Sequence, residues 1–301
     1  MKIKYQMISR HILFAITTAL LFLSSCGKVY DKNGFDWEPD VPPSDSVFNR
    51  EIQVLNFSVN LPGGQQPINV ADPIFFSLER VSPIATAYKS TERWDFALSG
   101  LSRNEISANN GIRAGFGYGT SAVGGIVVLD SAYSQVTSIP DDSKFQIPGI
   151  AGLDDQGPFG VGLGHVAYTF FGNFIRPDLA AGVGSSNPDT AAKANQYIHL
   201  LYGLSENLIK AFPNAKNIQG GPLRPRTVII RTAAGNYAKF ETQSFYKDVL
   251  DPKLMRRGLD VPLALSFRYM VVKASERRFG FVSRRRPLKT NLSTHTGLIV
   301  N

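Results

Sequence analysis

The strongest constraint on the fold is a pair of apolar, β-branched segments separated by a short turn. The first covers residues 227–232 and the second residues 237–242, with Ala-Ala-Gly-Asn between them. A glycine in such a short connection lets the chain reverse, so the pair predicts an antiparallel β-hairpin. Tyr237 and Phe240 are three positions apart and therefore point to opposite faces, which indicates a sheet packed on both sides.

Further segments have the same alternating or β-branched character. They cover residues 52–59, 73–78, 94–100, 124–129, 165–171 and 263–273. Glycine and proline in the connections favour turns. One segment differs, because apolar residues recur at helical spacing from a cap at Asp189 and Thr190 as far as Ile209. We therefore expect a mainly β protein, an antiparallel β-sheet domain with a helical insertion.

The N-terminus has the three parts of a bacterial export signal. Lys2, Lys4 and Arg10 give a positive start, and an apolar segment at residues 12–23 follows. That segment is shorter than the roughly 20 residues that span a bilayer. It ends in Leu-Ser-Ser-Cys, the pattern of a lipobox. Residues 1–25 are thus predicted to be a lipoprotein signal peptide and Cys26 the lipidated residue; the alternative is a plain signal peptide with an incidental cysteine.

Cys26 is the only cysteine of the chain, so disulfides, thiolate metal sites and cysteine nucleophiles are excluded. Residues 26–50 are polar and proline-bearing and are predicted to be a flexible tether before the domain at residues 51–272. Residues 273–301 carry seven lysines and arginines against one glutamate and are predicted to be a solvated basic tail. Since the signal and this tail carry the positive charge of the chain, we expect no nucleic-acid partner.

Two motifs bear on function. The first is Trp-Asp-Phe-Ala-Leu-Ser-Gly at residues 94–100, and the second is Arg-Thr-Ala-Ala-Gly-Asn-Tyr-Ala-Lys-Phe at residues 231–240. A glycine-rich region lies between them, and Ser-Phe-Tyr-Lys at residues 244–247 and Phe-Arg-Tyr at residues 267–269 follow. In content and order these motifs resemble those of the HmuY family of surface lipoproteins.

The resemblance covers roughly residues 50–272 and implies an HmuY-like β domain without enzymatic activity. It implies haem as the cofactor, capture of that haem at the outer membrane or cell surface, and its delivery to an outer-membrane receptor. The membrane itself would be a partner through the lipid anchor. The alternative is the same scaffold without haem, acting as a ligand- or partner-binding surface lipoprotein.

Haem iron requires axial donors such as His, Met, Cys or Tyr in an apolar slot. The family keeps two donors after its tryptophan–aspartate strand, whereas residues 101–150 of this chain contain neither histidine nor methionine. The family's ligand pair therefore cannot be transferred. The candidate donors are His165 beside a glycine in a strand, Met255 in a polar loop, and Tyr118 and Tyr133 in the region where the family keeps its donors. Each of them has packing or surface exposure as its alternative.

No catalytic motif is present: the chain lacks both the Gly-x-Ser-x-Gly elbow and the His-Glu-x-x-His zinc motif. The acidic pairs Asp141–Asp142 and Asp154–Asp155 suit calcium or glycoside chemistry in type, but acids in turns are ordinarily solvated. His199, on the expected helix, is interpreted as structural.

Overall fold

The computed structural model describes residues 42–58, 72–100, 102–112, 115–147, 149–154, 162–258, 260–280 and 285–293. The predicted signal peptide, Cys26 and most of the predicted tether lie outside these residues. Within the described part of the chain, no helix has the length and apolar character needed to cross a membrane.

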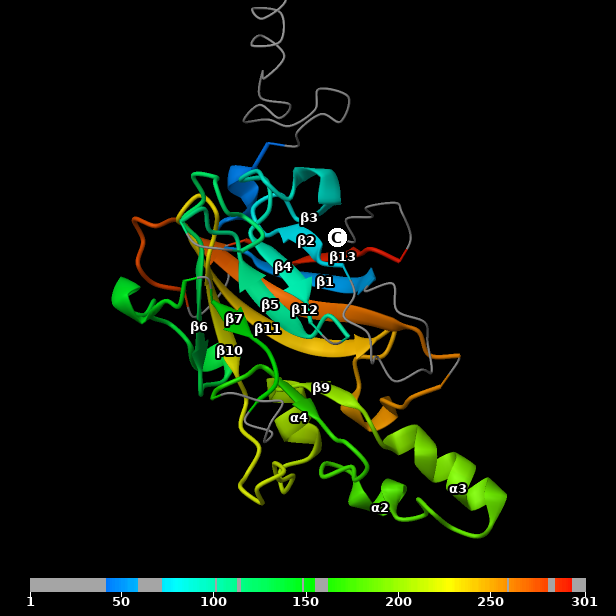
Figure 1. The fold of residues 1–301 in the computed structure, drawn as a ribbon. Helices are drawn as coiled ribbons and strands as arrows, with labels where there is room; N and C mark the ends of the chain where they lie inside the picture. Colours follow the sequence, from blue (N-terminus) through cyan, green and yellow to red (C-terminus); the bar gives the residue numbers. More distant parts are fainter. Residues whose placement is uncertain are drawn as a thin grey trace, which may run out of the picture. The chain divides into compact units, whose positions relative to one another are not determined.

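Two β-sheets form the body of the domain (Figure 1). The six-stranded sheet has the order β13 (Leu288–Asn291), β1 (Glu51–Ser58), β12 (Leu263–Val272), β11 (Tyr237–Tyr246), β10 (Thr227–Arg231) and β6 (Gly125–Leu129). The five-stranded sheet has the order β3 (Ser82–Ile84), β2 (Ile74–Ser77), β4 (Phe96–Ser99), β5 (Glu105–Ala108) and β7 (Ile150–Ala151). A separate pair joins β8 (Val166–Tyr168) to β9 (Leu201–Gly203). Apart from the parallel β1–β13 pair, the strands of these sheets pair in antiparallel fashion. The expectation of a mainly β protein with antiparallel sheets is confirmed.

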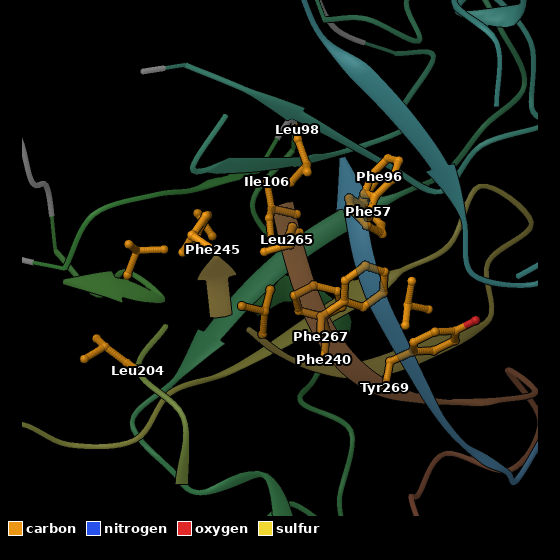
Figure 2. Packing of buried hydrophobic residues seen from close by; sticks show 14 of the residues in the cluster. Phe57, Phe96, Leu98, Ile106, Leu204, Phe240, Phe245, Leu265, Phe267 and Tyr269 are labelled. Carbon is orange, nitrogen blue, oxygen red and sulfur yellow. The ribbon is translucent and has the colours of Figure 1, made fainter. Parts of the chain in front are cut away.

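The main core lies between the two sheets and is aromatic (Figure 2). Phe96 of β4 has its ring centroid 5.5 Å from that of Phe240 on β11. Phe76 of β2 meets Phe267 of β12 edge-to-face at 5.3 Å. Such pairs contribute about 0.5–1.5 kcal/mol each beyond the burial of their area. These contacts fix one sheet on the other.

Successive side chains of β10, β11 and β12 point to opposite faces of the six-stranded sheet and therefore belong to two different hydrophobic clusters. Phe240 faces the main core, whereas Tyr237 packs in a second cluster on the outer face with Phe145, Val136 and Phe279. The predicted hairpin is observed as β10 and β11, and its second strand is covered on both faces as expected. Gly235, at φ +90°, supplies the left-handed residue that the turn needs.

Trp94 lies outside the main core. It is fully buried, but in a small third cluster with Phe75 and Ala97, and its Nε1–H donates to the Lys89 carbonyl at 2.9 Å. Trp94 therefore supports the outer face of the five-stranded sheet.

The prediction of one helix from residue 189 to residue 209 is wrong. The structure has α2 (Pro177–Ala180), α3 (Pro188–Ala194) and α4 (Glu206–Ala211), with β9 between α3 and α4. His199 adopts φ +54°, which ends any helix, and Gly203 packs where a Cβ would collide with the Thr242 carbonyl of β11. The cap of α3 is Asn187, whose Oδ1 accepts from two backbone N–H groups.

The folded part extends beyond residues 51–272 on both sides. Phe48, in the predicted tether, forms a β-bridge with Val271, so residues 42–50 are not simply a linker. In the predicted basic tail, β13 pairs with β1, and Phe279 is buried in the outer cluster. Within β13, Leu288 and Thr290 are less exposed than Lys289 between them. This alternation is too short to recognise from the sequence, because the segment before it is rich in arginine.

Candidate functional site

A groove opens beside the helical insertion. It has a volume of about 870 Å³ and lies between residues 172–181 and residues 211–220. Its apolar lining includes Ile175, Phe212 and Ile218 together with several alanines. We call it the α2–α4 groove, because α2 lies on one side and the end of α4 on the other. Its volume falls within the roughly 300–1,000 Å³ of small-molecule sites.

Local hydrogen bonds shape this groove. Asn173 Oδ1 accepts from the backbone N–H groups of Ile175 and Arg176 at 3.0 and 2.9 Å, which turns the chain into α2. The Arg176 guanidinium lies 5.4 Å from the Phe212 ring centroid, joining the two walls. Among the described residues, the groove lining contains no His, Met, Cys or Tyr, so these residues offer no usual donor to haem iron.

His165 is buried with both ring nitrogens occupied. Its Nε2 lies 2.9 Å from the Asn104 carbonyl oxygen, which only accepts, so Nε2 carries the proton. Nδ1 then accepts from the Thr242 hydroxyl at 2.8 Å. Burial lowers the pKa of His165 to about 4, and the ring is therefore neutral at pH 7. Ligation of iron by His165 would require breaking one of these buried contacts.

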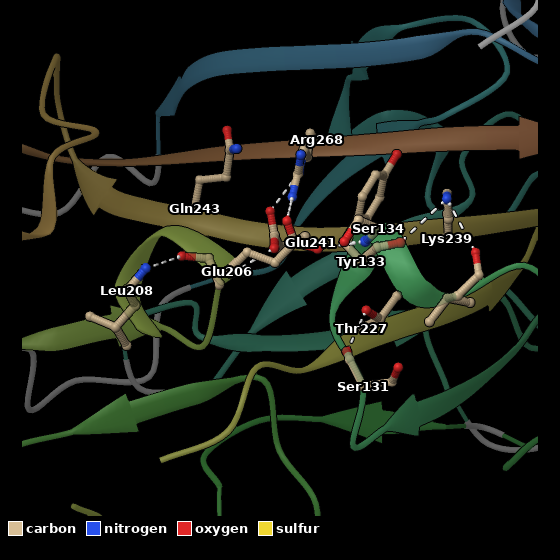
Figure 3. Close-up of polar contacts among 12 residues, drawn as sticks. Ser131, Tyr133, Ser134, Glu206, Leu208, Thr227, Lys239, Glu241, Gln243 and Arg268 are labelled. Carbon is tan, nitrogen blue, oxygen red and sulfur yellow. Dashed lines mark hydrogen bonds and ion pairs between the residues drawn. The ribbon is translucent and has the colours of Figure 1, made fainter. Parts of the chain in front are cut away.

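Tyr133 is held against the outer face of the six-stranded sheet (Figure 3). The Arg268 guanidinium and the Lys239 ammonium lie 4.3 and 4.5 Å from its ring centroid. Burial raises the pKa of the Tyr133 phenol well above its ordinary value, which disfavours the tyrosinate that ferric iron needs. Its hydroxyl has no hydrogen-bond partner within the described residues.

Beside Tyr133, Arg268 forms two ion pairs. Its Nε donates to Glu241 at 2.6 Å and its Nη2 to Glu206 at 3.0 Å (Figure 3). Burial raises the pKa of the Glu241 carboxyl, and Arg268 opposes that rise. These pairs connect α4 to the sheet, and we interpret them as structural.

The two remaining candidate donors lie in opposite environments. Met255 was expected in a polar loop but is 2% exposed and belongs to the main core, because the Pro252–Leu254 turn folds it inward. Tyr118 is 65% exposed on the glycine-rich loop. No hydrogen bond or ring contact joins any two of the four candidates within the described part of the chain.

His199 was interpreted as structural from the sequence, but in the structure one of its ring nitrogens is buried without a hydrogen-bond partner among the described residues. Nδ1 is hydrogen-bonded to the Tyr168 hydroxyl at 2.8 Å, whereas Nε2 has no partner among the described residues. Phe171, 74% exposed, meets the His199 ring edge-to-face at 4.7 Å. Burial is the main cause that lowers the pKa of His199. The adjacent Phe170-Phe171 pair was a usable signal, but only the fold places it against residue 199.

The two motifs of the resemblance meet through buried carboxylates. Asp95 Oδ2 accepts from Leu78 N at 2.7 Å, and Asp95 Oδ1 accepts from Ala233 N, in the hairpin turn, at 3.1 Å. Glu79 Oε1 accepts from the Thr232 hydroxyl at 2.6 Å. Burial, reinforced by the charge of Glu79, raises the pKa of Asp95 to about 6. This cluster joins the two sheets, and none of its residues lines the α2–α4 groove.

The described members of the two acidic pairs make contacts within the protein. Asp141 accepts from Ser143 N at 2.9 Å, and Asp142 pairs with Arg277 at 2.9 Å. Asp154 pairs with Arg226 at 3.3 Å, and Asp155 lies outside the described residues. No group of three or more His, Cys, Asp or Glu side chains suited to a metal ion occurs in the described ranges.

Comparison of the chain with protein-family models and with curated proteins finds no match. The function of the α2–α4 groove must therefore be argued from its own chemistry.

Proposed function

We propose that the protein is a non-enzymatic, lipid-anchored binding protein of the outer membrane or cell surface that holds a small apolar ligand in the α2–α4 groove. The observation that carries the proposal is the groove itself, a largely apolar hollow of about 870 Å³. Burial of apolar ligand surface contributes about 25 cal/mol per Å². Because the groove lining offers no usual axial donor, the groove supports the alternative in which the β scaffold binds a ligand other than haem.

A substitution that fills the groove tests the proposal. Ala211 lies in the lining and is half-buried, so Ala211→Trp places an indole in the hollow. Ala192→Trp, on the exposed surface of α3, is the matched control. The fluorescence of the neutral probe N-phenyl-1-naphthylamine should rise with the wild type and the control and stay low with Ala211→Trp. Equal probe binding by all three proteins would contradict the proposal.

Haem capture with delivery to an outer-membrane receptor is the second candidate function. The observation in its favour is His199, whose Nε2 is unpartnered beside the exposed Phe171 ring. If the Nδ1–H of His199 donates to Tyr168, Nε2 carries a lone pair without a hydrogen bond, and iron reaches this buried atom only if the side chains around it move. Tyr118 is 65% exposed and is an accessible donor, but no contact among the described residues connects it to His199.

Hemin titration separates the two candidates. If haem is ligated, the Soret band shifts and sharpens, and His199→Ala abolishes this change, whereas His165→Ala leaves it in place. A spectrum that stays featureless with the wild type would remove haem capture and leave the groove proposal standing.

The anchor has its own test. Cells supplied with radiolabelled palmitate should label the wild type, and Cys26→Ser should prevent the label. Labelling that persists in the Cys26→Ser variant would contradict the lipid anchor.

A further inference from the structure

The α2–α4 groove has an ammonium group at its wall without a counter-ion. Lys216 is exposed and makes no ion pair or side-chain hydrogen bond within the described residues. Its backbone is fixed, because residues 216 and 222 form an isolated β-bridge. The bridge fixes the Cα of Lys216 beside the apolar lining, and its side chain is free to turn toward a ligand in the groove.

The other charged side chains of the groove neutralise each other. Arg176 donates from Nε and Nη2 to the two carboxylate oxygens of Asp178, at 3.2 and 3.1 Å. This bidentate pair is the favoured arrangement of a guanidinium and a carboxylate. Within the lining, Lys216 is then the charge left over for a ligand.

The surroundings are basic as well. A second hollow of about 460 Å³ shares Ala211 with the groove and is lined by Lys210 and Lys253. Its single acid, Asp251, accepts from the backbone N–H of Lys253 at 2.9 Å. Each hollow is thus lined by two cations and one carboxylate, which leaves a net positive charge beside the apolar lining of the groove. Such a field attracts anions and repels cationic ligands.

We propose that the α2–α4 groove binds a long-chain carboxylate, with the hydrocarbon chain on the lining of Ile175, Phe212 and Ile218 and the carboxylate at Lys216. This assignment deepens the proposed function and rests on it. An open groove with an apolar floor and one cation at the wall matches a ligand with an apolar body and a single anionic end. A neutral hydrocarbon would leave Lys216 unused.

The test compares an acid with its uncharged ester. The fluorescent fatty acid cis-parinaric acid and its methyl ester are titrated into the purified full-length chain, with Ala211→Trp as the filled-groove reference. Lys216→Met removes the charge and keeps the apolar stem, and Lys193→Met on α3 is the matched control. Because all variants share the N-terminal residues, differences between them report on the groove.

Lys216→Met should weaken binding of the acid about threefold to fivefold, as expected for a partly exposed ion pair, and leave binding of the ester unchanged. Lys193→Met should match the wild type for both ligands. If acid and ester bind equally and Lys216→Met changes neither, the carboxylate assignment is overturned while the groove proposal survives. If Ala211→Trp alters the binding of neither ligand, the groove proposal itself fails.

Discussion

Asp95 and His165 are predicted to oppose each other in the pH dependence of stability. Burial and Glu79 raise the pKa of Asp95 from 3.8 to about 6. The folded state therefore favours protonated Asp95, and the free energy of unfolding falls as the pH rises from about 4 to 6. The size of this effect is roughly 3 kcal/mol, because one pH unit of pKa change corresponds to about 1.4 kcal/mol. Above pH 6 the contribution is constant.

His165 acts in the other direction. Burial lowers its pKa from 6.5 to about 4, so the folded state excludes the charged ring. The free energy of unfolding then rises by roughly 3 kcal/mol as the pH increases from 4 to 6.5. In the wild type the two contributions therefore oppose each other over this pH range.

Asp95→Asn should expose the histidine contribution. The variant loses absolute stability, since an amide nitrogen cannot accept from Leu78 N. The informative quantity is the slope: relative to the wild type, its free energy of unfolding should increase by roughly 2 kcal/mol between pH 4 and 6, because part of the full difference falls outside this range. Urea denaturation followed by the fluorescence of buried Trp94 measures this difference.

Asp189→Asn, on the exposed surface of α3, is the matched control and should keep the wild-type profile. Groups that titrate in all variants cancel in the comparison. A profile for Asp95→Asn that runs parallel to that of the wild type would refute the reasoning, because Asp95 would then titrate alike in the folded and unfolded states.

Three further predictions concern stability and are measured by urea denaturation at pH 7. Phe267→Ala removes a ring at the centre of the aromatic core and should cost about 3–5 kcal/mol, whereas Phe116→Ala, at a partly exposed ring, should cost far less. Arg268→Met leaves the buried Glu241 carboxylate unpaired and should cost about 3 kcal/mol, much of which Glu241→Gln in the same chain should restore. Gly203→Ala forces β9 away from β11 and should cost about 1–3 kcal/mol; an unchanged midpoint would contradict the close approach of these strands.

The parts of the fold that were predictable from the sequence rest on local patterns. The β-branched residues and Gly235 predict the hairpin of β10 and β11. The alternation of side chains along a strand alone places Tyr237 and Phe240 on opposite faces. The helix expected up to Ile209 failed because helical spacing says nothing of a left-handed residue at His199. Tertiary contacts overrode the pattern there.

The candidate site was less predictable, because its determinants are non-local. His165 has the right residue type for a donor, yet its ring nitrogens are occupied by Asn104 and Thr242, which are 61 and 77 positions away. The α2–α4 groove likewise arises from two segments that carry no motif. Residue types alone cannot reveal which polar atoms are already satisfied.

The position of β1 has a consequence for the order of folding. Both of its neighbours, β12 and β13, come from residues beyond 262, so the first strand of the six-stranded sheet can find neither partner until those residues have been synthesised. Pairings between such remote segments form slowly, since a long loop must close before any contact is gained. We therefore expect that ribosome-bound chains stopped before β12 remain sensitive to protease, and that resistance appears in one step once β13 has left the exit tunnel.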